Sequence, residues 1–286
     1  MGSYMMKKLK CLCGSRNYVK LFERKDRGHN FEIIRCQDCG LARTLPPPDD
    51  SRERYRHYGI NQYLKNSKLV ASFMDRIIDE VTRFKKKGKL LEIGCNLGYL
   101  LEIAKKKGFW VRGVELDVKA VKYANKLLGR GTVIEGILQE IKFPDRYFDV
   151  VVMSHVIEHI VDPLDLFKEI KRMLKNDGIF VVVAPNFDSF CAKIKKEKWP
   201  GLQPKEHVWQ FGIVTLKELL KRGGFEVVRI KTSGLHHSLA SAMKSIKENA
   251  RDNGSPKHII YSLLNWLLGK FNQGDNMFIT AIKYEK

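Results

Sequence analysis

From residue 89 onward, the sequence alternates between short apolar runs and segments whose apolar residues recur at helical spacing. The runs have the length and composition of buried strands, and the intervening segments are typical of amphipathic helices. The expected strands are residues 89–93, 110–115, 133–135, 147–153, 179–184, 225–231 and 277–284. Strands that alternate with helices form a mostly parallel, doubly wound sheet with right-handed crossovers. The sequence therefore predicts an α/β, Rossmann-like domain around a seven-stranded sheet.

Two segments of different texture precede this domain. Residues 7–45 contain paired cysteines and short β-like runs, so we expect a small separate module there. Pro46 begins a Pro-rich stretch that breaks regular structure. Apolar residues at helical spacing follow it, and residues 46–88 are therefore expected to form a linker and a helical cap. The α/β domain then covers residues 89–286, with a helical insertion at 235–272 before its last strand.

A glycine turn follows the first strand of the α/β domain. Gly94 and Gly98 let the backbone turn tightly and approach a ligand, and Asn96 between them is the non-glycine type that best tolerates positive φ. Glu115 ends the second strand, 21 residues after Gly94. A carboxylate there can accept hydrogen bonds from both ribose hydroxyls of a nucleoside. Because the turn is not G-x-G-x-x-G, and because an acidic residue, Glu92, precedes it, the pattern favours S-adenosylmethionine over NAD.

Several stretches together resemble the class I S-adenosylmethionine-dependent methyltransferases. They are residues 91–98, 114–117, 148–151, 156–163 and 174–180. Over residues 89–231 the chain is similar to the small-molecule enzymes related to ubiquinone O-methyltransferases. The resemblance implies a set of cofactor-binding residues: Glu92, Gly94, Cys95, Asn96, Gly98, Glu115, Leu116, Ile137, Leu138, Ser154 and His155. It implies that Glu92 and the glycines hold the methionine end, and that Glu115 holds the ribose.

The segment His155-Val156-Ile157-Glu158-His159 matches the H-x-x-E-H motif of one class of zinc proteases. That chemistry requires both histidines on one face of a helix. Here the motif starts at the end of a predicted strand, inside the methyltransferase pattern. We therefore interpret His159 as a packing or hydrogen-bonding residue near the mouth of the substrate site.

Four of the six cysteines lie near the N-terminus, in the pairs Cys11/Cys13 and Cys36/Cys39. Each pair is followed by glycine, and two such turns can place four thiolates tetrahedrally around Zn²⁺. Free thiols and an iron centre are the alternatives. A zinc ribbon followed by a Pro-rich link, Tyr55 and Tyr58, and then the methyltransferase core resembles the zinc-bearing sugar C-methyltransferases. Those enzymes also carry a large C-terminal domain that this sequence does not contain, so the resemblance does not fix a sugar as acceptor.

Glu206-His207 lies in the loop that follows the fifth strand of the α/β domain. Methyl transfer requires an aligned acceptor and often removal of its proton. The sugar C-methyltransferases have a similar Glu-His pair, and this resemblance nominates His207 as a general base or positioning group, oriented by Glu206. The alternative is a structural pair that fastens the loop to the core. We expect the 187–211 loop, the 235–272 insertion with its His236-His237, and the Tyr55/Tyr58 region to form the acceptor walls.

The chain is strongly basic, with 52 Lys and Arg against 32 Asp and Glu, for a net charge of +20. The charge is spread along the sequence, which favours a solvated surface over a polyanion-binding one. Residues 258–271 are apolar with basic flanks, and we expect a helix packed on the core or on a second subunit, or one at a membrane interface. No apolar run reaches the roughly 18 residues of a membrane-spanning helix, and the first ten residues lack a signal segment. We expect a cytoplasmic monomer or homodimer.

Three functions remain open at the level of the sequence. The favoured one is methylation of an oxygen or carbon on a small molecule such as a sugar, a quinone, a polyketide or a lipid-linked intermediate. The second is RNA methylation through the basic surface and the ribbon, although Ala184-Pro185-Asn186-Phe187 is not the N-P-P-Y type found in base-amino methyltransferases. The third is a non-catalytic binding module, which the intact cofactor motif disfavours.

Overall fold

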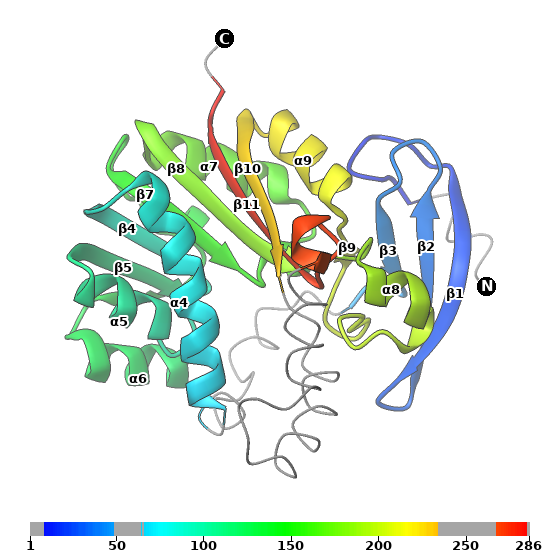
Figure 1. The fold of residues 1–286 in the computed structure, drawn as a ribbon, viewed down its shortest axis with the longest axis horizontal. Coiled ribbons are helices and arrows are strands. Elements are labelled where there is room, and N and C mark those ends of the chain that lie inside the picture. Colours follow the sequence, from blue (N-terminus) through cyan, green and yellow to red (C-terminus); the bar gives the residue numbers. More distant parts are fainter. Residues whose placement is uncertain (1–8, 49–63, 65, 234–266, 285–286) are drawn as a thin grey trace.

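A computed structural model describes residues 9–48, 64, 66–233 and 267–284, and the described residues form two sheets (Figure 1). The strands of the larger sheet are β4 (Gly88–Ile93), β5 (Phe109–Glu115), β6 (Val133–Glu135), β7 (Phe148–Ser154), β8 (Leu174–Pro185), β10 (Phe225–Ser233) and β11 (Asn276–Lys283). Their order is β10-β11-β8-β7-β4-β5-β6. The five strands from β6 to β8 pair in parallel, and β11 pairs antiparallel with both β8 and β10. The predicted mostly parallel seven-stranded sheet is confirmed.

Helices cover both faces of this sheet, because its central strands are apolar on both sides. On one face lie α4 (Ser67–Phe84), α5 (Tyr99–Lys106) and α6 (Val118–Leu128), and on the other α7 (Pro163–Met173) and α9 (Ile213–Arg222). Strand β7 illustrates the reason. Val150 and Val152 point into the first core, whereas Val151 and Met153 point into the second, and all four are fully buried.

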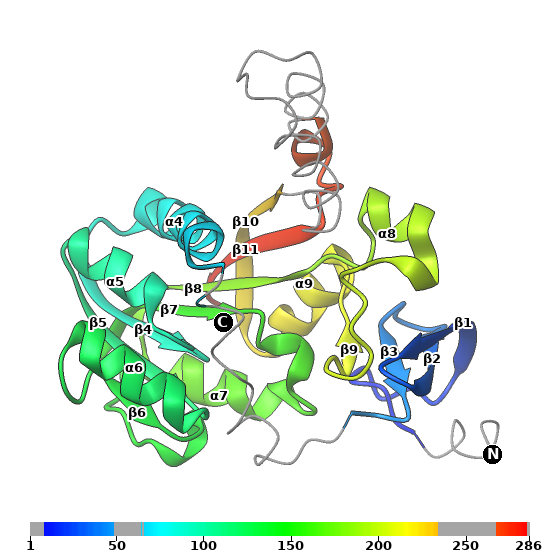
Figure 2. The same cartoon turned by 90° about the horizontal axis from the view of Figure 1, so that it is seen from below.

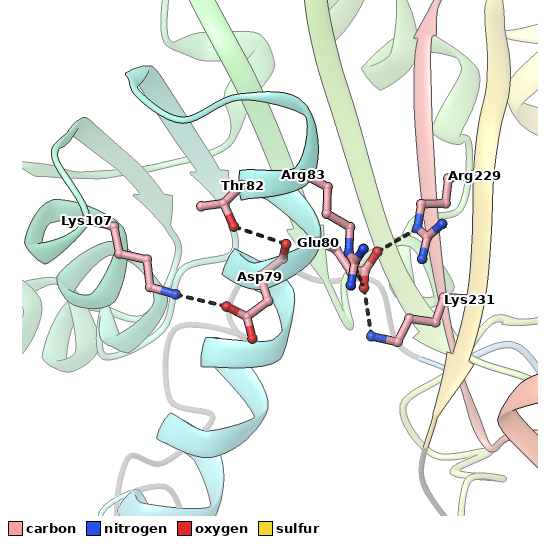
Figure 3. A network of polar contacts seen from close by, with 7 residues as sticks. All are labelled: Asp79, Glu80, Thr82, Arg83, Lys107, Arg229 and Lys231. Carbon is pink, nitrogen blue, oxygen red and sulfur yellow. Dashed lines mark hydrogen bonds and ion pairs between the residues drawn. The ribbon is translucent and has the colours of Figure 1, made fainter. Parts of the chain in front are cut away.

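A buried carboxylate fastens α4 to the edge strand β10 (Figure 3). Glu80 lies in the middle of α4 with its side chain only 2% exposed. Its oxygens accept hydrogen bonds from Arg229 Nε at 2.8 Å and from Lys231 Nζ at 2.7 Å, and Arg83 Nε lies 3.4 Å away. Burial alone would raise the pKa of Glu80, but Lys231 and Arg229 hold it below its usual range. The pairing therefore requires an ionised carboxylate.

The smaller sheet joins the N-terminal module to the α/β domain. Strands β1 (Tyr18–Asp26), β2 (His29–Cys36) and β3 (Ala42–Leu45) belong to the module, and the fourth strand, β9 (Trp209–Gln210), comes from the loop after β8. Its register pairs Ala42 with Gln210 and Arg43 with Trp209. The sequence predicted β1 and β2 but not this pairing, because two residues within a loop carry no strand periodicity.

The loop between β8 and α9 is itself anchored in the core. It contains α8 (Phe190–Lys195) and the 3₁₀ turn η3 (Lys196–Lys198). Asp275, buried before β11, accepts hydrogen bonds from Ser189 Oγ at 2.6 Å and from Trp199 Nε1 at 3.2 Å. Trp199 is fully buried. The loop is thus an ordered wall beside the end of β8, where open α/β sheets place their ligands.

Part of the predicted insertion, together with several candidate residues, lies outside the described part of the chain. Only residues 267–270 of the expected 235–272 helical insertion are described as helical. Tyr55, Tyr58, His236 and His237, and residues 258–266 of the apolar segment, are among those not described. Within the described ranges, no helix combines the length and apolarity that crossing a membrane demands.

Candidate functional site

The turn between β4 and α5 has the backbone conformation that its residue types favour. Gly94, Asn96 and Gly98 have φ of 70°, 45° and 78°, all in the left-handed region. A side chain at Gly94 would also meet Val156 Cγ2 at 2.5 Å, so the glycine is required twice over. The amide of Gly94 donates to the carbonyl of Val114 at 2.8 Å, which draws the turn against the end of β5.

Glu115 at the end of β5 holds this turn in place. Its Oε2 accepts a hydrogen bond from the amide of Asn96 at 2.8 Å, and its Oε1 accepts from the amides of Leu116 and Asp117 at 2.7 and 2.9 Å. Burial raises the pKa of Glu115, and the three amides oppose that effect. A carboxylate has about four acceptor sites, so capacity remains for a ligand hydroxyl.

Three buried polar atoms near this turn have no hydrogen-bond partner among the described residues: Glu92 Oε2, Asn96 Oδ1 and Ser154 Oγ. Burial raises the pKa of Glu92 well above its usual range, and the nearby Glu115 adds to the shift. Buried polar atoms are normally satisfied, so a cluster of orphans indicates a missing partner. The methionine end of S-adenosylmethionine would suit this set, and Glu92 would be the partner for its ammonium group.

The remaining residues that the resemblance nominated lie around the same edge of the sheet. Cys95 is buried within the turn, and its sulfur lies where a side chain on Gly113 would be. Ile137 is half-buried just after β6, whereas Leu138 is only 1% exposed and packs in the core. Leu138 is thus a core residue. A role for either beside the adenine stays a prediction, as does one for Leu116.

The H-x-x-E-H segment forms the centre of a buried polar cluster. His155 follows β7 with φ of 54°, and the next residues form the 3₁₀ turn η2 (Ile157–His159), not an α-helix. Glu158 is 1% exposed, with Oε1 3.3 Å from His155 Nδ1 and 3.9 Å from His207 Nε2. The ring of His159 packs edge-on against that of His207. Ligand atoms of Glu158, His159 and His207 all lie within 4.8 Å of one another, so this trio could also hold a cation.

The contacts of Glu206 and His207 differ from the predicted pair. The Glu206 carboxylate binds Arg27 at 2.7 Å, and the carboxylate beside His207 Nε2 is that of Glu158. The amides of Glu206 and His207 both donate to the carbonyl of Gln203, and this tight turn separates the two side chains. Sequence reasoning noted Glu158 only within the H-x-x-E-H match and missed its proximity to His207, which lies about 50 residues away along the chain.

Burial governs the charge of His207. It lowers the pKa of His207 to about 3, and the neighbouring His159 adds to the effect. The imidazole is therefore neutral near pH 7. Its Nδ1 has no hydrogen-bond partner among the described residues, and the backbone carbonyl of His207 accepts from Thr44 Oγ1 at 2.7 Å. A neutral ring with one unused nitrogen can align a polar group more readily than it can carry a proton.

The four N-terminal cysteines converge as the spacing of the pairs predicted. Sγ of Cys11 lies 3.6 Å from that of Cys39, Sγ of Cys13 lies 3.6 Å from that of Cys36, and all four lie within 4.8 Å. Sulfurs on a tetrahedral zinc with bonds of about 2.3 Å are about 3.8 Å apart. Burial raises the pKa of Cys11 and Cys39, and it opposes the amides of Cys39 and Asp38 that bring the pKa of Cys36 down to about 7. These thiols fit a zinc ion.

Comparison with known proteins decides the family. The model of a methyltransferase domain family matches residues 63–230, which is more than half of the chain. The chain belongs to the S-adenosylmethionine-dependent methyltransferases. A probable S-adenosylmethionine-dependent methyltransferase of Mycolicibacterium smegmatis is 32% identical over 170 residues, which are 58% of this methyltransferase and 60% of that protein. The chain thus matches less than two thirds of that relative's length.

A second relative agrees with this assignment, and a solved structure agrees with the fold. The ubiquinone biosynthesis O-methyltransferase of Nitrosomonas europaea is 27% identical over 175 residues, covering 58% of this chain and 67% of that enzyme. A crystal structure of an S-adenosylmethionine-dependent methyltransferase from Thermotoga maritima, described as a possible histamine N-methyltransferase, superposes with a TM-score of 0.56. It covers 82% of this chain and 100% of that one at 20% identity, so it supports the fold alone.

Proposed function

We propose that this methyltransferase moves the methyl group of S-adenosylmethionine to an oxygen or carbon of a small-molecule acceptor. The observation that carries the proposal is the set of orphaned polar atoms on Glu92, Asn96 and Ser154, gathered around the turn that Glu115 holds. The similarity to a ubiquinone biosynthesis O-methyltransferase supports a small organic acceptor. Sugars, quinones, polyketides and lipid-linked intermediates all belong to this class.

Glu92 and Glu115 are proposed to contact different parts of the cofactor. Bound S-adenosylmethionine supplies an electrophilic methyl group on its sulfonium. Glu92 would pair with the ammonium group, and Glu115 would accept from one ribose hydroxyl at the acceptor site that its three amide donors leave open. Binding of a cation should return Glu92 to its charged form, because an opposite charge lowers the pKa of a buried carboxyl. Glu92 is buried, and the low dielectric around it would strengthen such a pairing.

On the acceptor side, we propose that His207 aligns the acceptor without acting as a strong base. Its pKa of about 3 makes the protonated ring costly near pH 7. Nδ1 can instead hold a hydroxyl by a hydrogen bond, and the carboxylate of Glu158 lies 3.9 Å from Nε2 of the same ring. In-line attack on a sulfonium depends chiefly on alignment, and an acidic acceptor arrives already deprotonated.

We also propose that Cys11, Cys13, Cys36 and Cys39 hold one structural Zn²⁺. Four thiolates fill a tetrahedral coordination shell and leave no position for water or substrate. The ion would stabilise the fold of the module that supplies β1 to β3. Because β9 pairs with β3, the ion would also support the 187–211 loop, to which β9 belongs.

Calorimetric titration of the purified chain with S-adenosylmethionine tests the proposal. We expect binding, and we expect Glu115→Gln to weaken it by about 10–100-fold, since hydrogen bonds to a charged group contribute about 1.5–3 kcal/mol. Glu135→Gln is the matched control, because Glu135 ends the adjacent strand β6 opposite Glu115 and is exposed. No binding, or a preference for NAD, would overturn the proposal. Transfer of radiolabelled methyl groups into RNA and not into small organic molecules would favour the RNA alternative.

A further inference from the structure

Three large apolar side chains are exposed on the 187–211 loop and on the segment next to it. Phe190 and Ile194 lie four residues apart on α8, and therefore on one face of that helix. They are 45% and 63% exposed, and Phe271, just after the helical turn 267–270, is 67% exposed. The amide of Phe190 donates to the carbonyl of Gln273 at 3.1 Å, which brings the two segments side by side. Exposed aromatic and aliphatic groups gathered in this way indicate an interaction surface.

Lysines adjoin these apolar groups. Lys195 ends α8, and Lys196 and Lys198 belong to η3, which follows directly. The structure gives none of the three an ion pair within its described ranges, and Glu197 is the acidic residue among them. Lys193 lies on the same helix and donates to Gln273 at 3.2 Å. We call the surface formed by Phe190, Ile194, Phe271, Lys195, Lys196 and Lys198 the α8 patch.

The α8 patch follows the carboxyl end of strand β8. Strand β8 ends at Pro185 and runs parallel to β7, so α8 begins near the carboxyl ends of the sheet strands. Figure 2 shows α8 at one end of the molecule and α6 at the other. The segment is held firmly, because Ser189 caps α8 and Trp199 is buried behind η3. The exposed apolar groups are thus presented by an ordered element.

We propose that the α8 patch docks on the surface of an anionic phospholipid membrane. Apolar side chains flanked by lysines match the chemistry of that surface, where the apolar groups enter the acyl boundary and the ammonium groups meet phosphates. A protein partner would need matching apolar and acidic groups, whereas a bilayer offers both without a shaped site. Docking there would place the carboxyl ends of the strands close to the lipid. The proposal does not depend on the acceptor, since docking needs neither acceptor nor cofactor.

Sedimentation with vesicles tests the proposal directly. We expect the full chain to bind vesicles of phosphatidylcholine mixed with phosphatidylglycerol, to bind phosphatidylcholine alone weakly, and to be released by salt. Each lysine near an anionic surface contributes about fivefold to the binding constant. Lys195→Gln/Lys198→Gln should therefore weaken binding by about 25-fold. Lys122→Gln/Lys126→Gln removes the same charge from the exposed side of α6, and should change binding by less than about twofold.

A second variant tests the apolar contribution. Ile194→Ser/Phe271→Ser should weaken vesicle binding by roughly tenfold or more. In the parent chain, both apolar side chains move from water into the acyl boundary on docking, and the serines gain nothing from that transfer. Its melting temperature should match that of the parent chain, since both side chains are already mostly exposed. Failure to bind the mixed vesicles at low salt, or equal losses in the α6 control, would overturn the proposal. The proposal would also fail if Ile194→Ser/Phe271→Ser melted at a lower temperature but still bound vesicles. It would fail as well if the chain did not bind vesicles but bound tRNA through Lys195 and Lys198.

Discussion

Replacement of Glu80 by Gln should destabilise the fold because it removes the charge of one buried carboxylate. Removing one member of a buried ion pair costs about 3–5 kcal/mol. Its partners Arg229, Lys231 and Arg83 are 37–56% exposed, so water stabilises them once unpaired. A loss of about 2–3 kcal/mol follows. At about 2–4 °C per kcal/mol, thermal melting followed by circular dichroism should shift down by about 4–12 °C.

Asp79→Asn is the matched control for this prediction. Asp79 is the preceding residue on α4, and its carboxylate binds Lys107 Nζ at 2.9 Å (Figure 3). The Asp79 side chain is 56% exposed, so the same change in charge should cost about 0.5 kcal/mol, or about 1–2 °C. Equal melting temperatures for the two variants would refute the reasoning, because Glu80 is buried among three cationic groups whereas Asp79 is exposed beside Lys107.

The free energy of unfolding at acid pH provides an independent test of the charge on Glu80. Its folded pKa is depressed below the ordinary value of 4.5, so the stabilisation is fully present above that pH. It is lost as the pH falls below 4.5 and through the folded pKa. The difference in free energy of unfolding between the parent chain and Glu80→Gln should therefore shrink in this window. A difference that stays constant down to pH 3 would contradict the ionised pairing.

Two further predictions concern the cysteine cluster and the acceptor side. Cys36→Ser should remove the bound zinc, measured by elemental analysis, whereas Cys191→Ser, which changes another buried cysteine, should leave one zinc per chain. His207→Ala should lower turnover by roughly 10–100-fold with little change in cofactor affinity, while the exposed His29→Ala should have no effect. Because the pKa of His207 lies near 3, titration of this residue should cause no change in turnover between pH 6 and 9. A change in turnover with pH near neutrality that disappears in His207→Ala would identify the ring as a general base instead.

The parts of the molecule that could be predicted from the sequence are those set by local chemistry. The turn with Gly94, Asn96 and Gly98 follows from a strand, three positive-φ residues and a helix in immediate succession. The alternation of apolar runs with helical segments predicted the seven-stranded sheet. The observed strand bounds differ from the expected ones by one or two residues in most cases. Strand β8 is the exception, since it begins at Leu174 through polar residues that carry no apolar run.

The contacts that escaped prediction join distant segments. Arg27 reaches Glu206 across about 180 residues, and Glu158 reaches His207 across about 50. Nothing in the neighbourhood of Glu206 indicated that its carboxylate would pair with the hairpin between β1 and β2. Adjacency in sequence favoured the Glu206-His207 pairing, but the turn at Gln203 sends the two side chains to different partners. Long-range pairing depends on the assembled fold, which periodicity does not encode.

The fourth strand of the small sheet has a consequence for engineering. Transplanting the cysteine module alone onto another protein would expose the edge of β3, whose partner β9 stays behind. An unpaired edge is a template for aggregation. A graft that also carries the two residues of β9, with the loop anchored by Trp199, would keep the edge covered. The transferable unit is therefore discontinuous in sequence, and truncation at residue 45 would divide it.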